Sequence, residues 1–193
     1  DLPWEKLDAT TFSWQKVLGG EAQHGVIVLS PRAIKRLENY IPKRAIPKIF
    51  QIANKGKINR KLFQGSTINT PSMLCFEDVL DSLKWVEDIG GLEKTIQLSK
   101  ENLSIVKSKI KNSLWLEFLP ELENTISCTS ICLKVKNNIL NAYGEELLKE
   151  KMKNLFTFLE SENVAYDINS YRDAPIGIRI WGGATVEKGN IDI

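Results

Sequence analysis

The strongest constraint on the fold is a change of hydrophobic period within the last third of the chain. Ile131, Leu133 and Val135 alternate with polar or small residues, which is the two-residue period of a half-buried strand. Residues 145–161 then carry apolar side chains at helical spacing, and short β-branched runs follow at 164–168 and 178–181. A strand, a helix and two strands in this order predict a small α/β layer.

The first third of the chain has weaker signals. The first 14 residues are predicted to be irregular. Residues 25–30 form an apolar, β-branched run that predicts a short buried strand. Ser30 and Pro31 suit the N-cap and first turn of a helix that ends near Tyr40.

Two longer helices are predicted between this region and the α/β layer. One begins near Thr70 and ends at the Gly90–Gly91 pair, with Phe76, Leu80, Leu83 and Val86 on its apolar face. The second runs over 92–111. A helix of this length commonly links domains, so we predict a division into 1–100 and 101–193.

Composition limits the classes of protein to which the chain can belong. Its 193 residues are 42% hydrophobic and 26% charged, which is ordinary globular usage and excludes a disordered chain or a collagen. No run of about 18 apolar residues predicts a membrane span. The net charge of +2 gives no general argument for nucleic acid as a partner. We therefore expect neither membrane nor nucleic acid among its partners.

Cysteine and histidine usage predicts reduced thiols and no metal site. The three cysteines, Cys75, Cys128 and Cys132, lack a paired-ligand spacing, and His24 is the single histidine. No apolar signal segment opens the chain, so a cytoplasmic location is the expectation. We expect His24 to be structural or to line a ligand loop, and Asp167 to be a solvent-facing or loop acid.

Residues 39–76 contain seven basic residues and no acidic one. Because helix and strand periods are both weak there, we predict mostly loop. A solvated basic loop is the simpler interpretation, and a loop that attracts an anionic ligand is the alternative.

Lys16 is the strongest candidate for chemistry. It lies among aromatic and small residues just before Gly19–Gly20. Burial there would favour the uncharged, nucleophilic amine that a Schiff base requires, whereas an ordinary surface lysine is the alternative.

Three blocks of sequence resemble the phosphoserine aminotransferase family. They are Ser-Trp-Gln-Lys-Val-Leu-Gly-Gly-Glu at 13–21, Thr-Ile-Asn-Thr-Pro-Ser-Met at 67–73, and the segment 171–185 that begins Tyr-Arg-Asp-Ala-Pro. The resemblance covers essentially the whole chain. It implies an α/β chain with the pyridoxal-phosphate-dependent transferase fold (aspartate aminotransferase-like): residues 1–100 would be the end of the large, cofactor-binding domain and residues 101–193 a small C-terminal α/β domain, truncated at its end.

The same resemblance implies an activity and its residues. The family transfers an amino group from glutamate to 3-phosphohydroxypyruvate in serine biosynthesis, using pyridoxal 5′-phosphate. By resemblance Lys16 forms the Schiff base with the cofactor and shuttles the proton, and Gln15 contacts the cofactor. Asn69 and Thr70 would bind the cofactor phosphate of a neighbouring subunit, which implies a homodimer.

Two arginines would bind the substrate, a small phosphorylated amino or keto acid. Arg179 would take its α-carboxylate as a bidentate fork, and Arg172 its phosphate. Several relatives have a histidine where this chain has Tyr171, and the segment between the arginines is one residue longer here.

The acid that holds the pyridine nitrogen and the aromatic that stacks on the ring lie upstream of the lysine in this fold. Only 15 residues precede Lys16. We therefore expect the chain to be the C-terminal half of such an enzyme and to be inactive alone. The alternatives are a related aminotransferase or lyase of another small acid, or a non-catalytic fragment that self-associates.

Overall fold

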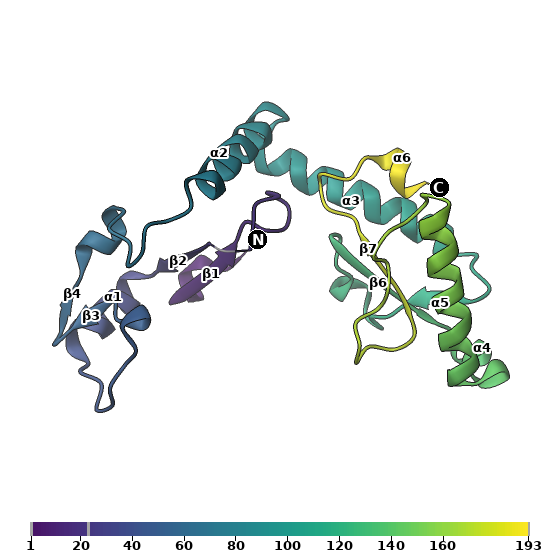
Figure 1. The fold of residues 1–193 in the computed structure, drawn as a ribbon, viewed down its shortest axis with the longest axis horizontal. Helices are drawn as coiled ribbons and strands as arrows, with labels where there is room; N and C mark the ends of the chain where they lie inside the picture. The colour runs from purple at the N-terminus through teal and green to yellow at the C-terminus, as the bar shows by residue number, and fades with distance from the viewer. Residues whose placement is uncertain (1, 23, 193) are drawn as a thin grey trace. The chain divides into compact units, whose positions relative to one another are not determined.

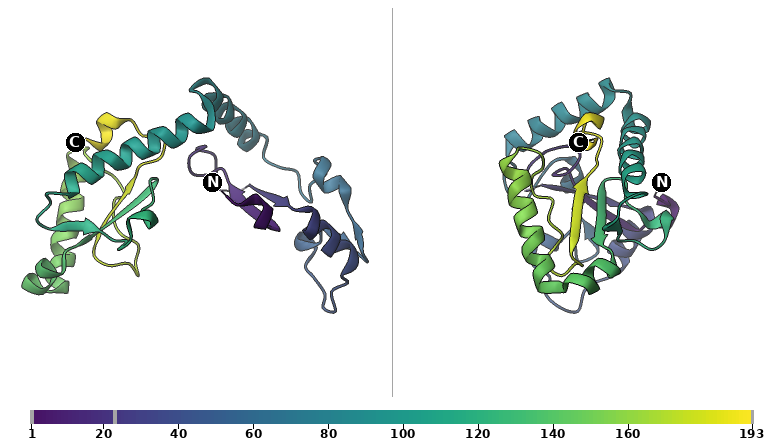
Figure 2. Two further views of the ribbon diagram at one scale, coloured as in Figure 1. Left: turned by 180° about the vertical axis from the view of Figure 1, so that it is seen from behind. Right: turned by 90° about the vertical axis from the view of Figure 1, so that its right-hand side faces the viewer.

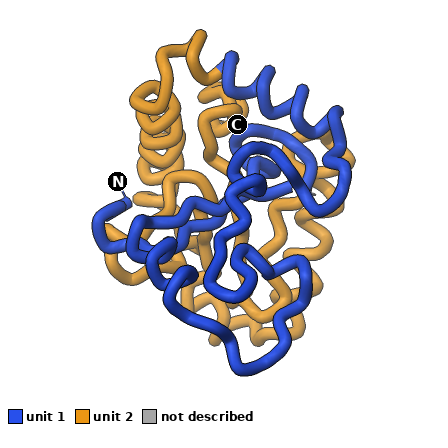
Figure 3. Tube along the Cα trace, turned by 90° about the vertical axis from the view of Figure 1, so that its left-hand side faces the viewer, with its two compact units in different colours: residues 1–85 blue, residues 86–193 orange. Residues whose placement is uncertain are grey.

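The computed structural model describes residues 2–22 and 24–192 and divides the chain into two compact units, 1–85 and 86–193 (Figure 3). The division falls before residue 100 because helix α3 (Gly91–Ile110) packs against elements of the second unit. No helix in the described ranges is long and apolar enough to cross a membrane.

A β-hairpin is the framework of the first unit (Figure 1). Strand β1 (Ala9–Ser13) pairs antiparallel with β2 (Gly25–Leu29), from Ala9 opposite Leu29 to Ser13 opposite Gly25. The irregular N-terminus expected from the sequence is therefore wrong over residues 9–13, because the strand is fixed by its partner rather than by its own periodicity. The strand at 25–29 is confirmed, but its expected burial is wrong: Ile27 is 57% exposed.

Helix α1 (Pro31–Asn39) begins as predicted. The Ser30 hydroxyl accepts from the Ala33 amide at 3.1 Å, and Pro31 occupies the first helical turn. The basic region that follows is mostly loop, as expected. Its regular elements are the strands β3 (Ala53–Asn54) and β4 (Lys57–Ile58), with short 3₁₀ turns at Lys48–Phe50 and Arg60–Gln64.

Helix α2 (Met73–Asp88) completes the first unit and confirms the predicted helix. Its buried residues are Cys75 and Val79, whereas Leu80 and Leu83 of the expected apolar face are exposed. The amphipathic pattern located the helix correctly, but within this chain only part of its apolar face is covered.

The second unit contains a three-stranded antiparallel sheet in the order β5-β6-β7 (Figure 1). Its strands are β5 (Leu116–Phe118), β6 (Ser130–Val135) and β7 (Gly177–Trp181). Helices α4 (Asn137–Tyr143) and α5 (Glu145–Ser161) join β6 to β7, and α6 (Lys188–Ile191) follows β7. The α/β class, α3, β6, α5 and β7 are confirmed; β5 and α4 were not predicted.

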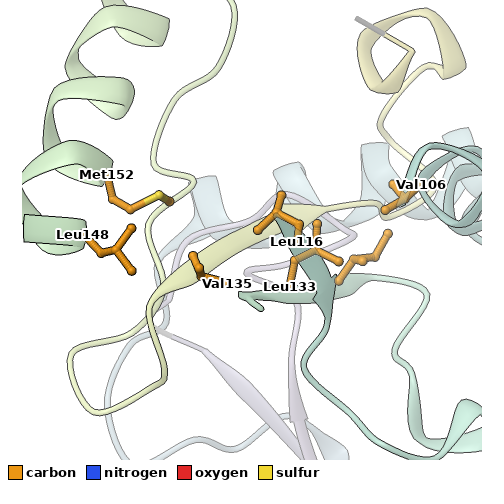
Figure 4. Packing of buried hydrophobic residues seen from close by; sticks show 7 residues of the cluster. Val106, Leu116, Leu133, Val135, Leu148 and Met152 are labelled. Atoms are coloured by element: carbon orange, nitrogen blue, oxygen red, sulfur yellow. The ribbon is translucent and has the colours of Figure 1, made fainter. Parts of the chain in front are cut away.

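The core of this unit lies between one face of the sheet and the helices (Figures 2 and 4). Ile131, Leu133 and Val135 of β6 alternate inward, and Leu148 and Met152 of α5 pack with them. Ile178 and Ile180 of β7 also pack against this cluster. Because successive residues of a strand face opposite sides, Arg179 lies on the other face of the sheet.

The strand predicted at 164–168 is wrong. Asn163 and Asp167 have positive φ values of 56° and 50°, which interrupt an extended run. Its backbone is attached to β7 by an isolated bridge between Asn169 and Ile178 and by a hydrogen bond from the Arg179 amide to the Ile168 carbonyl, 2.8 Å long. The apolar residues favoured a strand, but the chain forms an irregular segment beside the sheet.

Candidate functional site

Lys16 lies in the turn that leaves β1. The Gly19 amide donates to the Lys16 carbonyl at 3.0 Å, and the Gly20 amide donates to the Trp14 carbonyl at 3.0 Å. The burial that we considered for Lys16 is wrong, because its side chain and that of Gln15 are exposed. Among the described residues, the side-chain amine of Lys16 has no ion-pair or hydrogen-bond partner, so it is available to a ligand.

An aromatic cluster supports this turn. Trp14 is 7% exposed, and its ring centroid lies 5.9 Å from that of His24 and 6.0 Å from that of Phe76. Gly20 packs directly on Trp14: a Cβ at that position would lie 2.3 Å from the ring. The glycine is therefore required for the backbone to close over the indole.

Three contacts attach residues 18–24 to α2 and to Ser72 just before it. Later residues of 18–24 contact earlier residues of 72–82. The Ser82 hydroxyl donates to the Leu18 carbonyl. The Cys75 thiol donates to Glu21 Oε2 at 3.7 Å, and the Ser72 amide donates to His24 Nε2 at 3.3 Å. The segment that carries Lys16 is thus held along the start and middle of α2, and His24 has a packing role within it.

Asn69 and Thr70 lie in the segment that leads to this end of α2. The Thr67 hydroxyl donates to the Asn69 carbonyl at 2.6 Å and shapes the turn there. The side chains of Asn69 and Thr70 are exposed, and neither has a hydrogen-bond partner among the described residues. An amide and a hydroxyl in this state can donate to an anionic ligand.

These residues fit part of a pyridoxal phosphate site. Lys16 offers an exposed, unpaired primary amine on a fixed turn, which suits covalent attachment of an aldehyde. Asn69 and Thr70 offer donors suited to a phosphate. Among the described residues, no group of three or more His, Cys, Asp or Glu side chains could hold a metal ion.

Arg179 is held on the open face of β7. Its Nη1 donates to the Tyr171 hydroxyl at 2.8 Å, and its guanidinium carbon lies 4.4 Å from the centroid of the Tyr171 ring. Its Nη2 donates to Asp167 Oδ2 at 3.3 Å. Its Nε is buried and has no acceptor among the described groups. One N–H donor of the guanidinium is thus unpaired.

Arg172 lies in a different environment. It lines a pocket of about 400 Å³ between α5 and the segment 169–177, together with Lys149, Lys153 and the apolar Met152 and Phe156. Glu160 also lines the pocket, and Lys149 is paired with Glu145 and Glu146 at 2.7 and 3.4 Å, so Arg172 and Lys153 are the cations that this mixed lining offers to an anion. Tyr171, whose hydroxyl accepts from Arg179, also lines this pocket beside Arg172.

The sequence did not identify the partners of Arg179. Tyr171 was noted only as an unusual residue, and Asp167 was expected to face solvent. The side chain of Asp167 is indeed 89% exposed, yet it also forms an ion pair with Arg179. Both residues lie in an irregular segment, where no periodicity indicates which side chains meet a strand.

Comparison with known proteins gives matches over the whole chain. It is 52% identical over 192 residues to phosphoserine aminotransferase of Methanosarcina mazei, covering 100% of this chain and 49% of that protein. It is 53% identical over 188 residues to the phosphoserine aminotransferase of Methanosarcina barkeri, covering 97% of this chain and 48% of the relative. The chain spans about half the length of these curated relatives. No protein-family model matches it.

Solved structures agree on the fold. A phosphoserine aminotransferase from Cytophaga hutchinsonii matches with a TM-score of 0.74 at 20% identity, over 98% of this chain and 48% of that one. A phosphoserine aminotransferase studied for radiation damage of its Schiff base matches with a TM-score of 0.69 at 18% identity, over 98% of this chain and 46% of that one. The expected fold class, a portion of a phosphoserine aminotransferase, is confirmed.

Proposed function

We propose that this chain is the C-terminal half of a phosphoserine aminotransferase and that it carries the lysine and the carboxylate-binding arginine of that enzyme. The observation that supports this most directly is 52% identity along all of the chain to a phosphoserine aminotransferase. The assembled enzyme would act in the cytoplasm, in serine biosynthesis, as a homodimer that uses pyridoxal 5′-phosphate.

Lys16 would hold the cofactor. Its amine is exposed on a turn that the Trp14 ring and α2 fix, so the nucleophile is presented without a competing carboxylate. Pyridoxal phosphate, when bound, supplies an electron sink for the charge left on a substrate carbon. Once released, the same amine would move the proton at the substrate's Cα as a general base and acid.

Gln15, Asn69 and Thr70 would orient the cofactor. Gln15 adjoins the lysine, and Asn69 and Thr70 present donors ahead of α2. In a homodimer these two residues would serve the phosphate of the partner subunit's cofactor, so each site would be completed by the other chain.

Arg179 would bind the α-carboxylate shared by glutamate and the keto-acid substrate. A guanidinium presents parallel N–H groups that match a carboxylate in shape and charge. Arg172 would contact the substrate phosphate, supported by Lys153 as a second cation in the pocket that it lines. The substrate is thus a small acid with two anionic ends.

The test is a chimaeric enzyme. The half of the Methanosarcina mazei protein that this chain does not match is fused ahead of residue 1, and glutamate-dependent amination of 3-phosphohydroxypyruvate is measured. We expect activity, and a covalent cofactor adduct on Lys16 after borohydride reduction and mass spectrometry. The 193-residue chain alone is expected to show no turnover.

Variants of the chimaera assign the residues. Lys16→Ala is expected to remove both the adduct and the activity, whereas Lys84→Ala, at another exposed lysine, retains them. An adduct that persists in Lys16→Ala contradicts the assignment of the lysine. Equal turnover of pyruvate or glyoxylate contradicts a phosphorylated substrate.

A further inference from the structure

Arg179 is held by two residues of one irregular segment rather than by its own strand. Tyr171 contributes both a hydroxyl, 2.8 Å from Nη1, and a ring whose centroid lies 4.4 Å from the guanidinium carbon. Asp167 accepts from Nη2 through its carboxylate at 3.3 Å and through its carbonyl at 3.4 Å. Tyr171 thus fixes the plane of the guanidinium, while Asp167 occupies one of its donors.

The donor left over is Nε, which is buried and unpaired. In a guanidinium the N–H of Nε is parallel to one N–H of the adjacent Nη2, and this edge binds a carboxylate through two hydrogen bonds. Asp167 already uses Nη2 but gives Nε nothing. A carboxylate ligand that took both donors would therefore satisfy a buried group that the unliganded protein leaves without an acceptor.

The hold of Asp167 on Nη2 is weak. Its side chain is 89% exposed, and exposed ion pairs contribute little. A ligand can therefore displace the Asp167 carboxylate at small cost, whereas the Tyr171 contacts remain.

We propose that Tyr171 and Asp167 are positioning residues that set the carboxylate affinity of Arg179 in opposite directions. Tyr171 raises the affinity by holding the guanidinium in place, and Asp167 lowers it by competing for Nη2. This rests on the proposed function, in which Arg179 binds the substrate carboxylate. It adds that an acid of the protein itself competes with the substrate at that arginine.

The test uses the full 193-residue chain and the ¹⁵N–¹H resonance of Arg179 Nε. O-phosphoserine is titrated in, and phosphoethanolamine, which has the same phosphate and amine but no carboxylate, is the control ligand. We expect phosphoserine to shift the resonance of Arg179 Nε and phosphoethanolamine not to shift it. Tyr171→Phe should weaken the affinity by about two- to tenfold through loss of one hydrogen bond to a charged group. Asp167→Asn should tighten it by about two- to fivefold.

Control variants separate this inference from the function on which it rests. Tyr166→Phe removes another exposed hydroxyl of the same region, bonded to Asn163 Oδ1, and should leave the affinity unchanged. For Arg179→Lys, which lacks the Nε resonance, binding is followed through the backbone amide resonances of residues 177–181. If this variant leaves phosphoserine binding unchanged, the carboxylate role of Arg179 is wrong, and the inference with it. If Arg179→Lys weakens binding but the Tyr171 and Asp167 variants do not shift it in opposite directions, only the positioning roles are wrong.

A measurement without ligand tests the stacking of Tyr171 on Arg179 directly. The ring of Tyr171 should displace the proton resonances of the Arg179 side chain through its ring current, and Tyr171→Phe should preserve this displacement. Its absence in the unliganded wild-type chain would overturn the stacking on which the inference depends.

Discussion

At the scale of single residues, the contact between Gly20 and Trp14 is the tightest point of the turn that carries Lys16. A Cβ at position 20 would lie 2.3 Å from Cδ1 of an indole that is itself packed against His24 and Phe76. We expect Gly20→Ala to destabilise the chain by about 1–3 kcal/mol, the usual cost of overpacking.

Urea denaturation, monitored by tryptophan fluorescence, measures this change in stability. The matched control is Gly189→Ala, because a Cβ there meets nothing within 4 Å. If Gly20→Ala and Gly189→Ala unfold at the same urea concentration, the packing of the turn differs from the one described.

At the residue scale, the sequence predicts only what a local motif can carry. The surroundings of Lys16 in the sequence singled it out, but not its exposure, because a run of aromatic and small residues does not tell which of them covers the amine. Trp14 faces inward and Lys16 outward. The partners of Arg179 depend on a loop that crosses a strand, and no local pattern records such a crossing.

At the scale of elements, Asp8 joins the start of β1 to the start of α1. Its Oδ1 accepts from the Ser30 hydroxyl at 2.8 Å and from Arg32 Nε at 2.8 Å. The hydrogen bond from Ser30, and then that from Arg32, hold the pKa of the Asp8 carboxyl below its usual value. The stabilisation is therefore fully present above the unfolded value of about 3.9 and is lost as the pH falls through the lower folded value.

We expect Asp8→Asn to lower the stability of the first unit at pH 7 and to flatten its dependence on pH in acid. Circular dichroism during thermal unfolding between pH 2 and pH 7 checks both effects. Asp81→Asn, at an exposed acid of α2, is the matched control. A loss of stability that is equal at pH 2 and pH 7 would contradict a role for the Asp8 charge.

The elements with the longest hydrophobic patterns were the most predictable from the sequence. Helix α5 has the predicted bounds, and β6 shows the predicted alternation. The three-residue β5 is too short to show a period, and β1, although five residues long, does not alternate polar and apolar residues. Both strands depend on pairing with a neighbour. The run 164–168 has the composition of a strand, yet backbone dihedrals at Asn163 and Asp167 prevent one.

At the scale of the whole molecule, the two units differ in how much apolar surface they cover. The core cluster lies entirely in the second unit. In the first unit many large apolar side chains are exposed. They include Phe12, Ile27, Val28, Ile41, Ile49, Phe50, Phe63, Met73, Leu74, Leu80 and Leu83. Such a surface is typical of one that another part of an assembly covers.

We therefore expect the isolated 193-residue chain to self-associate at micromolar concentrations. Sedimentation velocity measures its mass distribution. Ile27→Lys, on the hairpin, should reduce association, whereas Leu114→Lys, at an 84% exposed residue of the second unit, should not. A single monomeric species across the concentration range would show that this apolar surface does not cause self-association.

The attachment of the Lys16 turn to a single face of α2 has a practical consequence for protein engineering. Cys75 and Ser82, which bond to the turn, lie two helical turns apart on that face, and their small side chains allow the turn to approach closely. Larger substituents there would push the lysine out of place. The exposed Leu80 and Leu83, by contrast, can be replaced by other side chains. Polar replacements at these two positions would make the chain easier to handle in solution while leaving the Lys16 turn intact.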